Sequence, residues 1–170
     1  MKKSILSFFI LIPLLIIGFA IYAMSTDDIE GIVVCATNDE ASYIPSRACE
    51  YYLFHFRLTE EDIKYIESRA GLSFLFGISD HNKKYRFLKY FIAKGVSVNM
   101  PSAIDGLPPL HAAILENDEK LVKFLLKNGA NIYKKDTKFN LTPEEFINLL
   151  NSKNTSTDRS NIKKLLSMHN

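Results

Sequence analysis

One segment of this chain is repeated after 34 residues. Residues 89–99, KYFIAKGVSVN, parallel residues 123–133, KFLLKNGANIY, and Gly95 and Gly129 are 34 residues apart. A third and weaker unit starts at residue 141 with Leu-Thr-Pro and continues with apolar residues at helical spacing. A period of this length is typical of proteins in which each repeat is a pair of short helices and neighbouring pairs stack. The sequence therefore predicts a mainly α-helical stack.

The unit at residues 105–136 carries the most specific local signals. Asp105-Gly106 suits a tight turn, and Pro109 is placed to open the first helix because its φ is already fixed. The second helix has an apolar stripe and ends at Gly129, which suits a left-handed cap. The stripe consists of Leu121, Val122, Leu125 and Leu126. Each of these signals favours the same helix–turn–helix unit.

With the residues DGLPPLHAA at 105–113, the stripe at 121–126 and NGAN at 128–131, this unit resembles an ankyrin repeat. It departs from the family pattern at Pro108, where the family has threonine. The resemblance extends more weakly to residues 72–100 and 141–166, and it leaves out the region before residue 70. It implies a short solenoid that binds a protein and is not an enzyme. It also implies that His111 bonds to the backbone of a neighbouring unit.

The resemblance further implies where a partner binds. Ankyrin stacks use the tips between repeats and the concave face of the first helices, which correspond here to residues 100–107, residues 134–140 and the end of the first helix. The predicted partner-binding residues are Met100, Ile104, Asp105, Leu107, Leu115, Glu116, Lys135 and Lys138. Three of these tip residues are apolar where a solvated loop needs none. They either anchor a partner or pack under the adjacent tip.

Residues 4–23 contain no charge and are long enough to span a bilayer as a helix. Lys2 and Lys3 precede them, which predicts that the rest of the chain is exported. The segment is either a cleaved signal peptide or a retained anchor, so the expected location is the periplasm or the periplasmic face of the inner membrane. Translation from Met24 would give a minor cytosolic form.

Cys35 and Cys49 are the two cysteines of the chain, and both follow the predicted export segment. Outside the cytoplasm such a pair forms a disulfide, which would contribute about 3 kcal/mol; the alternative is two buried free thiols. Without a nearby histidine pair the cysteines cannot complete a zinc site. Residues 24–70 are expected to hold this bridge, the first helices and a short strand at residues 31–35, where the chain is β-branched.

The charge of the chain and its motifs argue against several classes of function. The chain has 21 basic and 19 acidic residues, which is not the excess expected of a nucleic-acid binder. Residues 24–80 hold 11 acids and 4 bases, whereas residues 81–170 hold 8 acids and 15 bases. The basic half either solvates helix surfaces or faces an acidic partner or anionic lipid. No catalytic or phosphate-binding motif is present in the sequence, so no catalytic residue, metal or cofactor is predicted.

A small exported ankyrin-like chain resembles, in architecture, the immunity proteins of bacterial type VI lipase and toxin effectors. The sequence thus predicts an inhibitor that occludes a cognate toxin or hydrolase in the cell envelope. The alternative is an ankyrin scaffold that is anchored through residues 4–23 and organises envelope components.

Overall fold

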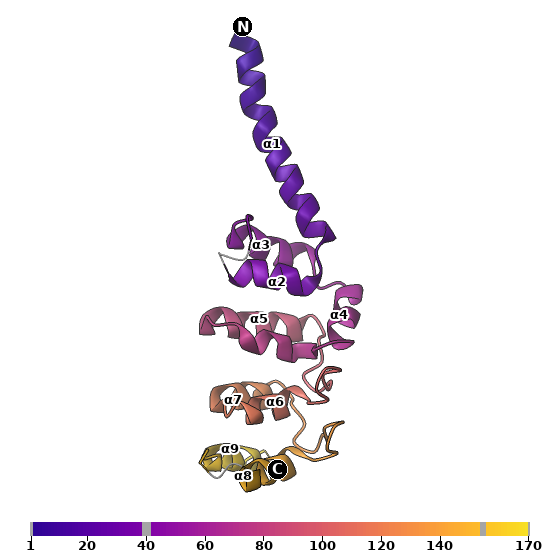
Figure 1. Ribbon diagram of the computed structural model, residues 1–170, viewed down its shortest axis with the longest axis vertical. Coiled ribbons are helices and arrows are strands. Elements are labelled where there is room, and N and C mark those ends of the chain that lie inside the picture. Colours follow the sequence, from indigo (N-terminus) through magenta and orange to yellow (C-terminus); the bar gives the residue numbers. More distant parts are fainter. Residues whose placement is uncertain (1, 39–41, 154–155, 170) are drawn as a thin grey trace. The chain divides into compact units, whose positions relative to one another are not determined.

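The computed structural model describes residues 2–38, 42–153 and 156–169, with side chains from residue 11 onward. The chain forms two compact units, residues 1–62 and residues 63–170. Helices make up the described structure, and no strand occurs in it (Figure 1). The prediction of a mainly helical solenoid with a disulfide-closed N-terminal segment is confirmed.

The first unit begins with α1 (Lys2–Thr26) and continues with α2 (Ile29–Thr37) and α3 (Ser46–Phe56). Side chains along α1 from Leu11 to Tyr22 are largely exposed, whereas Met24 is 6% exposed. Residues 4–10 of the predicted export segment lie in α1, but their side chains are outside the described part. Over the stretches that the structure describes, no helix combines the length and the apolar character required to cross a membrane.

The strand predicted at residues 31–35 is wrong, because these residues belong to α2. Asp28 caps this helix by accepting a hydrogen bond from the Gly31 N–H at 2.7 Å. Apolar residues then recur at helical spacing and are buried against α3. They are Ile29, Ile32, Val33, Cys35 and Ala36. Burial of this helical face outweighs the strand preference of the β-branched residues.

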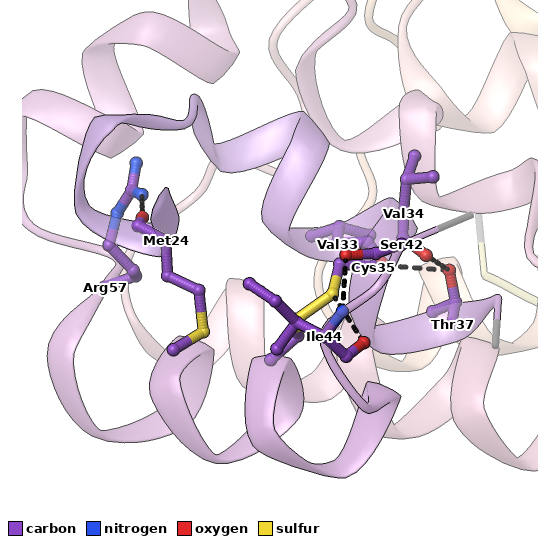
Figure 2. The surroundings of a disulfide bond; sticks show 9 residues. Met24, Val33, Val34, Cys35, Thr37, Ser42, Ile44 and Arg57 are labelled. Carbon is purple, nitrogen blue, oxygen red and sulfur yellow. Dashed lines mark hydrogen bonds between the residues drawn. A yellow bond between two sulfur atoms is a disulfide. The ribbon is translucent and has the colours of Figure 1, made fainter. Parts of the chain in front are cut away.

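Cys35 of α2 and Cys49 of α3 are joined in a disulfide, with their Cα atoms 5.9 Å apart (Figure 2). Both cysteines are buried, at 6% and 0% exposure. The bridge therefore ties the two helices together inside the core of the first unit. This outcome removes the alternative of two free thiols.

The N-terminal turn of α4 (Glu60–Glu67) carries a reciprocal cap. Thr59 Oγ accepts a hydrogen bond from the Asp62 N–H, and Asp62 Oδ2 accepts one from the Thr59 N–H, at 3.3 and 3.2 Å. Asp62 also accepts from Arg57 Nη2 at 2.6 Å. Burial opposes ionisation of Asp62, but the bonds from Arg57 and Thr59 outweigh it and lower the pKa of this carboxyl.

The second unit stacks three helix pairs (Figure 1). The pairs are the 3₁₀ helix η1 (Gly71–Gly77) with α5 (His81–Ala93), α6 (Pro109–Leu115) with α7 (Glu119–Lys127), and α8 (Pro143–Lys153) with α9 (Ser160–Ser167). The predicted stripe of α7 is buried at every position. Asp80 and Asp118 cap the second helices of the first two pairs by accepting from the N–H three residues on.

Both α5 and α7 end in the same C-terminal motif. The Val96 N–H donates to Phe91 O and the Ala130 N–H donates to Leu125 O, at 3.1 and 3.0 Å. Gly129 has φ +89°, as predicted for a left-handed cap. The motif turns the chain at the same point of each repeat, and it thereby places the tips that follow.

Candidate functional site

The first tip, residues 100–107, is held by its own hydrogen bonds. Ser102 organises it: its backbone N–H donates to Leu107 O at 3.0 Å, and its hydroxyl oxygen accepts from the Ile104 N–H at 3.2 Å. Asp105 Oδ1 accepts from the Leu107 N–H at 3.0 Å. These bonds fix Ile104 at the outer end of the tip, where its side chain is 73% exposed.

Asp136 organises the second tip, residues 134–140, in the same way. Its N–H donates to Leu141 O, and its carboxylate accepts from the N–H groups of Lys138, Phe139 and Leu141. Asp136 is 2% exposed. Burial alone would raise the pKa of Asp136, but the three backbone N–H groups lower it below its ordinary value. Asp136 is therefore an ionised structural centre of the tip.

The roles of Ser102 and Asp136 were not predicted from the sequence, although the repeat contains a signal for them. The two residues are 34 positions apart, the same distance that separates Gly95 and Gly129. The two tips are also bonded to each other. The Thr137 N–H and hydroxyl donate to Gly106 O at 2.9 and 3.2 Å. The tips therefore form one connected surface.

His111 lies beneath the second tip and is fully buried. Its Nε2–H donates to Leu141 O at 2.9 Å, which confirms the predicted bond to a neighbouring unit. Nε2 also lies 4.0 Å from Asp136 Oδ2, and Nδ1 is buried without a hydrogen-bond partner in the described structure. Burial lowers the pKa of His111, against smaller opposing effects of Leu141 O and Asp136. His111 is thus a neutral core residue.

The predicted partner-binding residues fall into three groups. At the tips, Met100 and Ile104 are 39% and 73% exposed, and Asp105, Lys135 and Lys138 are exposed as well. These five stay candidates for binding. Leu107 is 5% exposed, which favours the alternative that it packs under the tip over its role as an exposed anchor.

Leu115 and Glu116 are exposed at the far end of α6 from the tips. The seven residues of α6 separate them from Pro109 by roughly 10 Å along the helix axis. Burial raises the pKa of Glu116, and the neighbouring Lys84 partly offsets this. The structure therefore does not bring this pair together with the tip residues.

Two exposed aromatic residues that were not predicted adjoin the tips. Tyr133 is 65% exposed just before the second tip, and Phe139 is 44% exposed within it. The ammonium groups of Lys138 and Lys153 lie 5.4 and 5.9 Å from the centroid of the Phe139 ring. The second tip thus presents an aromatic ring between two cations.

One hollow of about 420 Å³ lies in the second unit. Its titratable side chains are Tyr133, Glu144, Lys163 and Lys164. Lys163 Nζ is 3.5 Å from Glu144 Oε1, with both side chains more than half exposed. No group of three or more His, Cys, Asp or Glu side chains within the described ranges could hold a metal ion.

Comparison with known proteins agrees with this geometry. The family model described as "Ankyrin repeats (3 copies)" matches residues 46–136. No curated protein and no solved structure matches the chain. The match begins at α3, so excluding every residue before 70 from the resemblance is wrong. The α8–α9 pair lies beyond the matched residues.

The matched residues are more than half of the chain, and they include the helices from α3 to α7, the first tip and the start of the second. Ankyrin repeats are a protein-interaction module, which accords with a rigid, partly apolar surface of tips. The chain is a member of the ankyrin-repeat family and serves as a protein-binding module.

Proposed function

We propose that this protein is an immunity protein that binds a cognate toxin or hydrolase in the cell envelope and occludes its active site. The observation that carries the proposal is the Ile104 side chain, which is 73% exposed on a tip held by internal hydrogen bonds. A large apolar side chain on a rigid support is a typical binding anchor, because little conformational entropy is lost when it is covered.

The neighbouring side chains supply the rest of an interface. Met100 and Phe139 add partly exposed apolar area, and Lys135 and Lys138 add positive charge at the second tip. An apolar centre with a cationic rim fits a protein surface that has an apolar depression bordered by carboxylates. A stable complex would bury about 1,200–2,000 Å² in total.

The location belongs to the same proposal. Residues 4–23 would direct the chain across the inner membrane, either as a cleaved signal peptide or as an anchor. The Cys35–Cys49 disulfide supports an oxidising compartment such as the periplasm. Inhibition there needs affinity and no chemistry, in keeping with a binding module.

The test is the Ile104→Asp variant against the secreted toxin or hydrolase encoded by the adjacent gene. Wild-type protein should inhibit this enzyme at a 1:1 ratio, and Ile104→Asp should weaken binding by about 30-fold or more in calorimetric titration. Met168→Asp is the matched control and should bind normally, because Met168 is 67% exposed directly after α9 (Ser160–Ser167), outside the tips. Equal affinity of Ile104→Asp and wild type would exclude the tips as the binding surface.

The exposed apolar side chains of α1 support a second candidate, an anchored scaffold that organises envelope components. The two functions predict different partners after purification from native envelopes. Recovery of the adjacent toxin supports immunity, whereas recovery of integral membrane proteins alone, with no inhibition of the toxin, supports the scaffold.

A further inference from the structure

The last two turns of α3 carry aromatic side chains that the protein itself does not cover. Tyr51 and Phe56 are each 60% exposed, and His55 is exposed beside them. The rings lie against one another: Tyr51 and His55 have centroids 4.0 Å apart, and Tyr52 and Phe56 have centroids 5.5 Å apart. We call these four residues, Tyr51, Tyr52, His55 and Phe56, the α3 aromatic face. Exposed clusters of this kind mark a surface that contacts something else.

The α3 aromatic face is next to the end of the apolar helix α1. Arg57, directly after α3, donates from Nη1 to Met24 O at 3.5 Å (Figure 2). The same Nη1 donates to Asp27 O at 3.0 Å. Met24 itself is buried in the first unit. The last turn of α1 is therefore packed against the rest of the first unit through Met24 and the bonds from Arg57.

The aromatic rings lie a short distance along α3 from the residue that is bonded to the end of α1. Residues 51–56 precede Arg57 by one to six positions, which is at most about 9 Å along α3. The polar interface on each side of the hydrocarbon core is roughly 5–8 Å thick. With residues 4–23 in the bilayer, Met24 lies at this interface, and the rings are within reach of it.

We propose that the α3 aromatic face rests in the bilayer interface beside the point where α1 leaves the membrane. The inference depends on the proposed anchoring by residues 4–23. Tyrosine rings favour this zone because they pair an apolar body with a hydroxyl that stays hydrated. The exposed part of α3 also carries Arg47, whose long side chain can reach the headgroups.

Lipid fits the α3 aromatic face better than a soluble protein does. Exposed apolar side chains also occur on α1, where Leu14, Leu15 and Phe19 are 60%, 66% and 72% exposed. Side chains are exposed on every side of this helix, from Leu11 to Tyr22, so the cover must surround it. A bilayer surrounds a helix and also offers an interface to the adjacent rings, whereas a single protein partner covers one side.

The experiment uses the absence of tryptophan from the sequence. Full-length Phe56→Trp protein is placed in phosphatidylcholine nanodiscs. Its tryptophan fluorescence is compared with that in nanodiscs whose lipids are brominated at shallow or at deep acyl positions. We expect the Phe56→Trp fluorescence to be quenched by at least about twofold more by shallow bromines than by deep ones. Leu14→Trp, in the middle of the apolar segment, should show the reverse order, and Tyr133→Trp, in the second unit, should not be quenched.

Each of the other results would contradict one part of the proposal. If Leu14→Trp is quenched and Phe56→Trp is not, the aromatic face is not in the bilayer, although the anchoring holds. If neither is quenched, anchoring fails and this inference fails with it. Protection of Phe56→Trp from acrylamide only after a soluble protein is added, without lipid, would make the face a protein-binding surface. Toxin inhibition by the same variants reports separately on the tips.

Discussion

At the residue scale, backbone conformation and close packing together dictate which side chains the tips accept. Gly106 has φ +76°, and a Cβ built on it would lie 2.6 Å from Thr137 Oγ and 3.2 Å from Lys138 N. Gly129 has φ +89° with open space around it. The two glycines therefore separate the cost of a left-handed backbone from the cost of a steric clash between tips.

Alanine at three glycines should give a graded loss of stability. Gly129→Ala is expected to lower the free energy of unfolding by about 1 kcal/mol through backbone strain alone. Gly106→Ala should cost more, because strain and the clash with the second tip add. Gly77→Ala is the control and should change little, because the φ of Gly77 is not in the left-handed region and no atom lies within 4 Å of the added Cβ. Urea unfolding of the three variants measures the order; equal losses at Gly106 and Gly129 would contradict the tip-to-tip contact.

His111 gives the second unit a sensitivity to acid. Its folded pKa is lowered by burial, so below the unfolded value of about 6.5 the unfolded chain binds more protons than the folded chain. Stability is full above that pH and falls as the pH drops through it toward the folded pKa. Asp136 affects stability at lower pH. Its contribution to the free energy of unfolding is present above about pH 4 and is lost as the pH falls through its own lowered pKa.

Replacing His111 by glutamine should remove the fall in stability that His111 causes between pH 7 and pH 5. The amide N–H₂ can still donate to Leu141 O but does not titrate near neutrality. Wild-type stability should fall between pH 7 and pH 5 with a slope of at most about 1.4 kcal/mol per pH unit, while His111→Gln stays nearly level. Denaturant midpoints at several pH values supply the comparison. Parallel slopes for the two proteins would assign the acid sensitivity to other groups.

At the element scale, helix α2 shows that a local sequence pattern is not enough to predict the secondary structure. The run Ile32-Val33-Val34 has strand propensity, which is why a strand is predicted there. The cap at Asp28 and the helical spacing of Ile29, Ile32 and Val33 are visible in the sequence as well, but they decide the structure only once α3 is present to bury them. By contrast, α7 was predictable, because its cap, stripe and terminal glycine all indicate one helix.

The disulfide between α2 and α3 should contribute to the first unit alone. It closes a loop of sequence separation 14, for which the loop-entropy relation gives about 3 kcal/mol. Cys35→Ala combined with Cys49→Ala, or reduction of wild type, should lower the stability of residues 1–62 by about this amount. Hydrogen exchange resolved by residue can follow both units. Reductant added to the double variant is the control. A loss of exchange protection in α6 and α7 as large as that in the first unit would show that the two units unfold together.

At the scale of the whole molecule, the period of 34 residues relates the hydrogen bonds of the two tips, although these bonds were not predicted from the sequence. It places Ser102 with Asp136 and Leu107 with Leu141, pairs that have equivalent hydrogen bonds in the two tips. Exposure could not be predicted in the same way. Whether an apolar tip residue points outward, as Ile104 does, or inward, as Leu107 does, depends on the backbone bonds within the tip.

A stack of repeats should unfold as one transition if its last helix pair is integral to it. Ile147 of α8 is fully buried, so Ile147→Ala is expected to cost about 2–5 kcal/mol and to lower the unfolding midpoint of the second unit as a whole. Asn148→Ala, at the exposed neighbouring position, should shift it by less than about 0.5 kcal/mol. Circular dichroism during heating measures the unfolding midpoints of both variants. A new early transition with the main one unmoved would mean that α8 and α9 melt independently.

The disulfide and the tips lie in different units, so the hydrogen bonds that position the tips do not involve the bridge. The bridge joins Cys35 to Cys49, whereas the proposed anchors at Met100, Ile104 and Phe139 belong to the second unit. A copy synthesised from Met24 and kept in a reducing cytosol would lack the bridge yet retain its tips. If the proposed immunity function holds, such a copy would bind a newly made toxin before secretion, and one fold would protect its producer on both sides of the membrane.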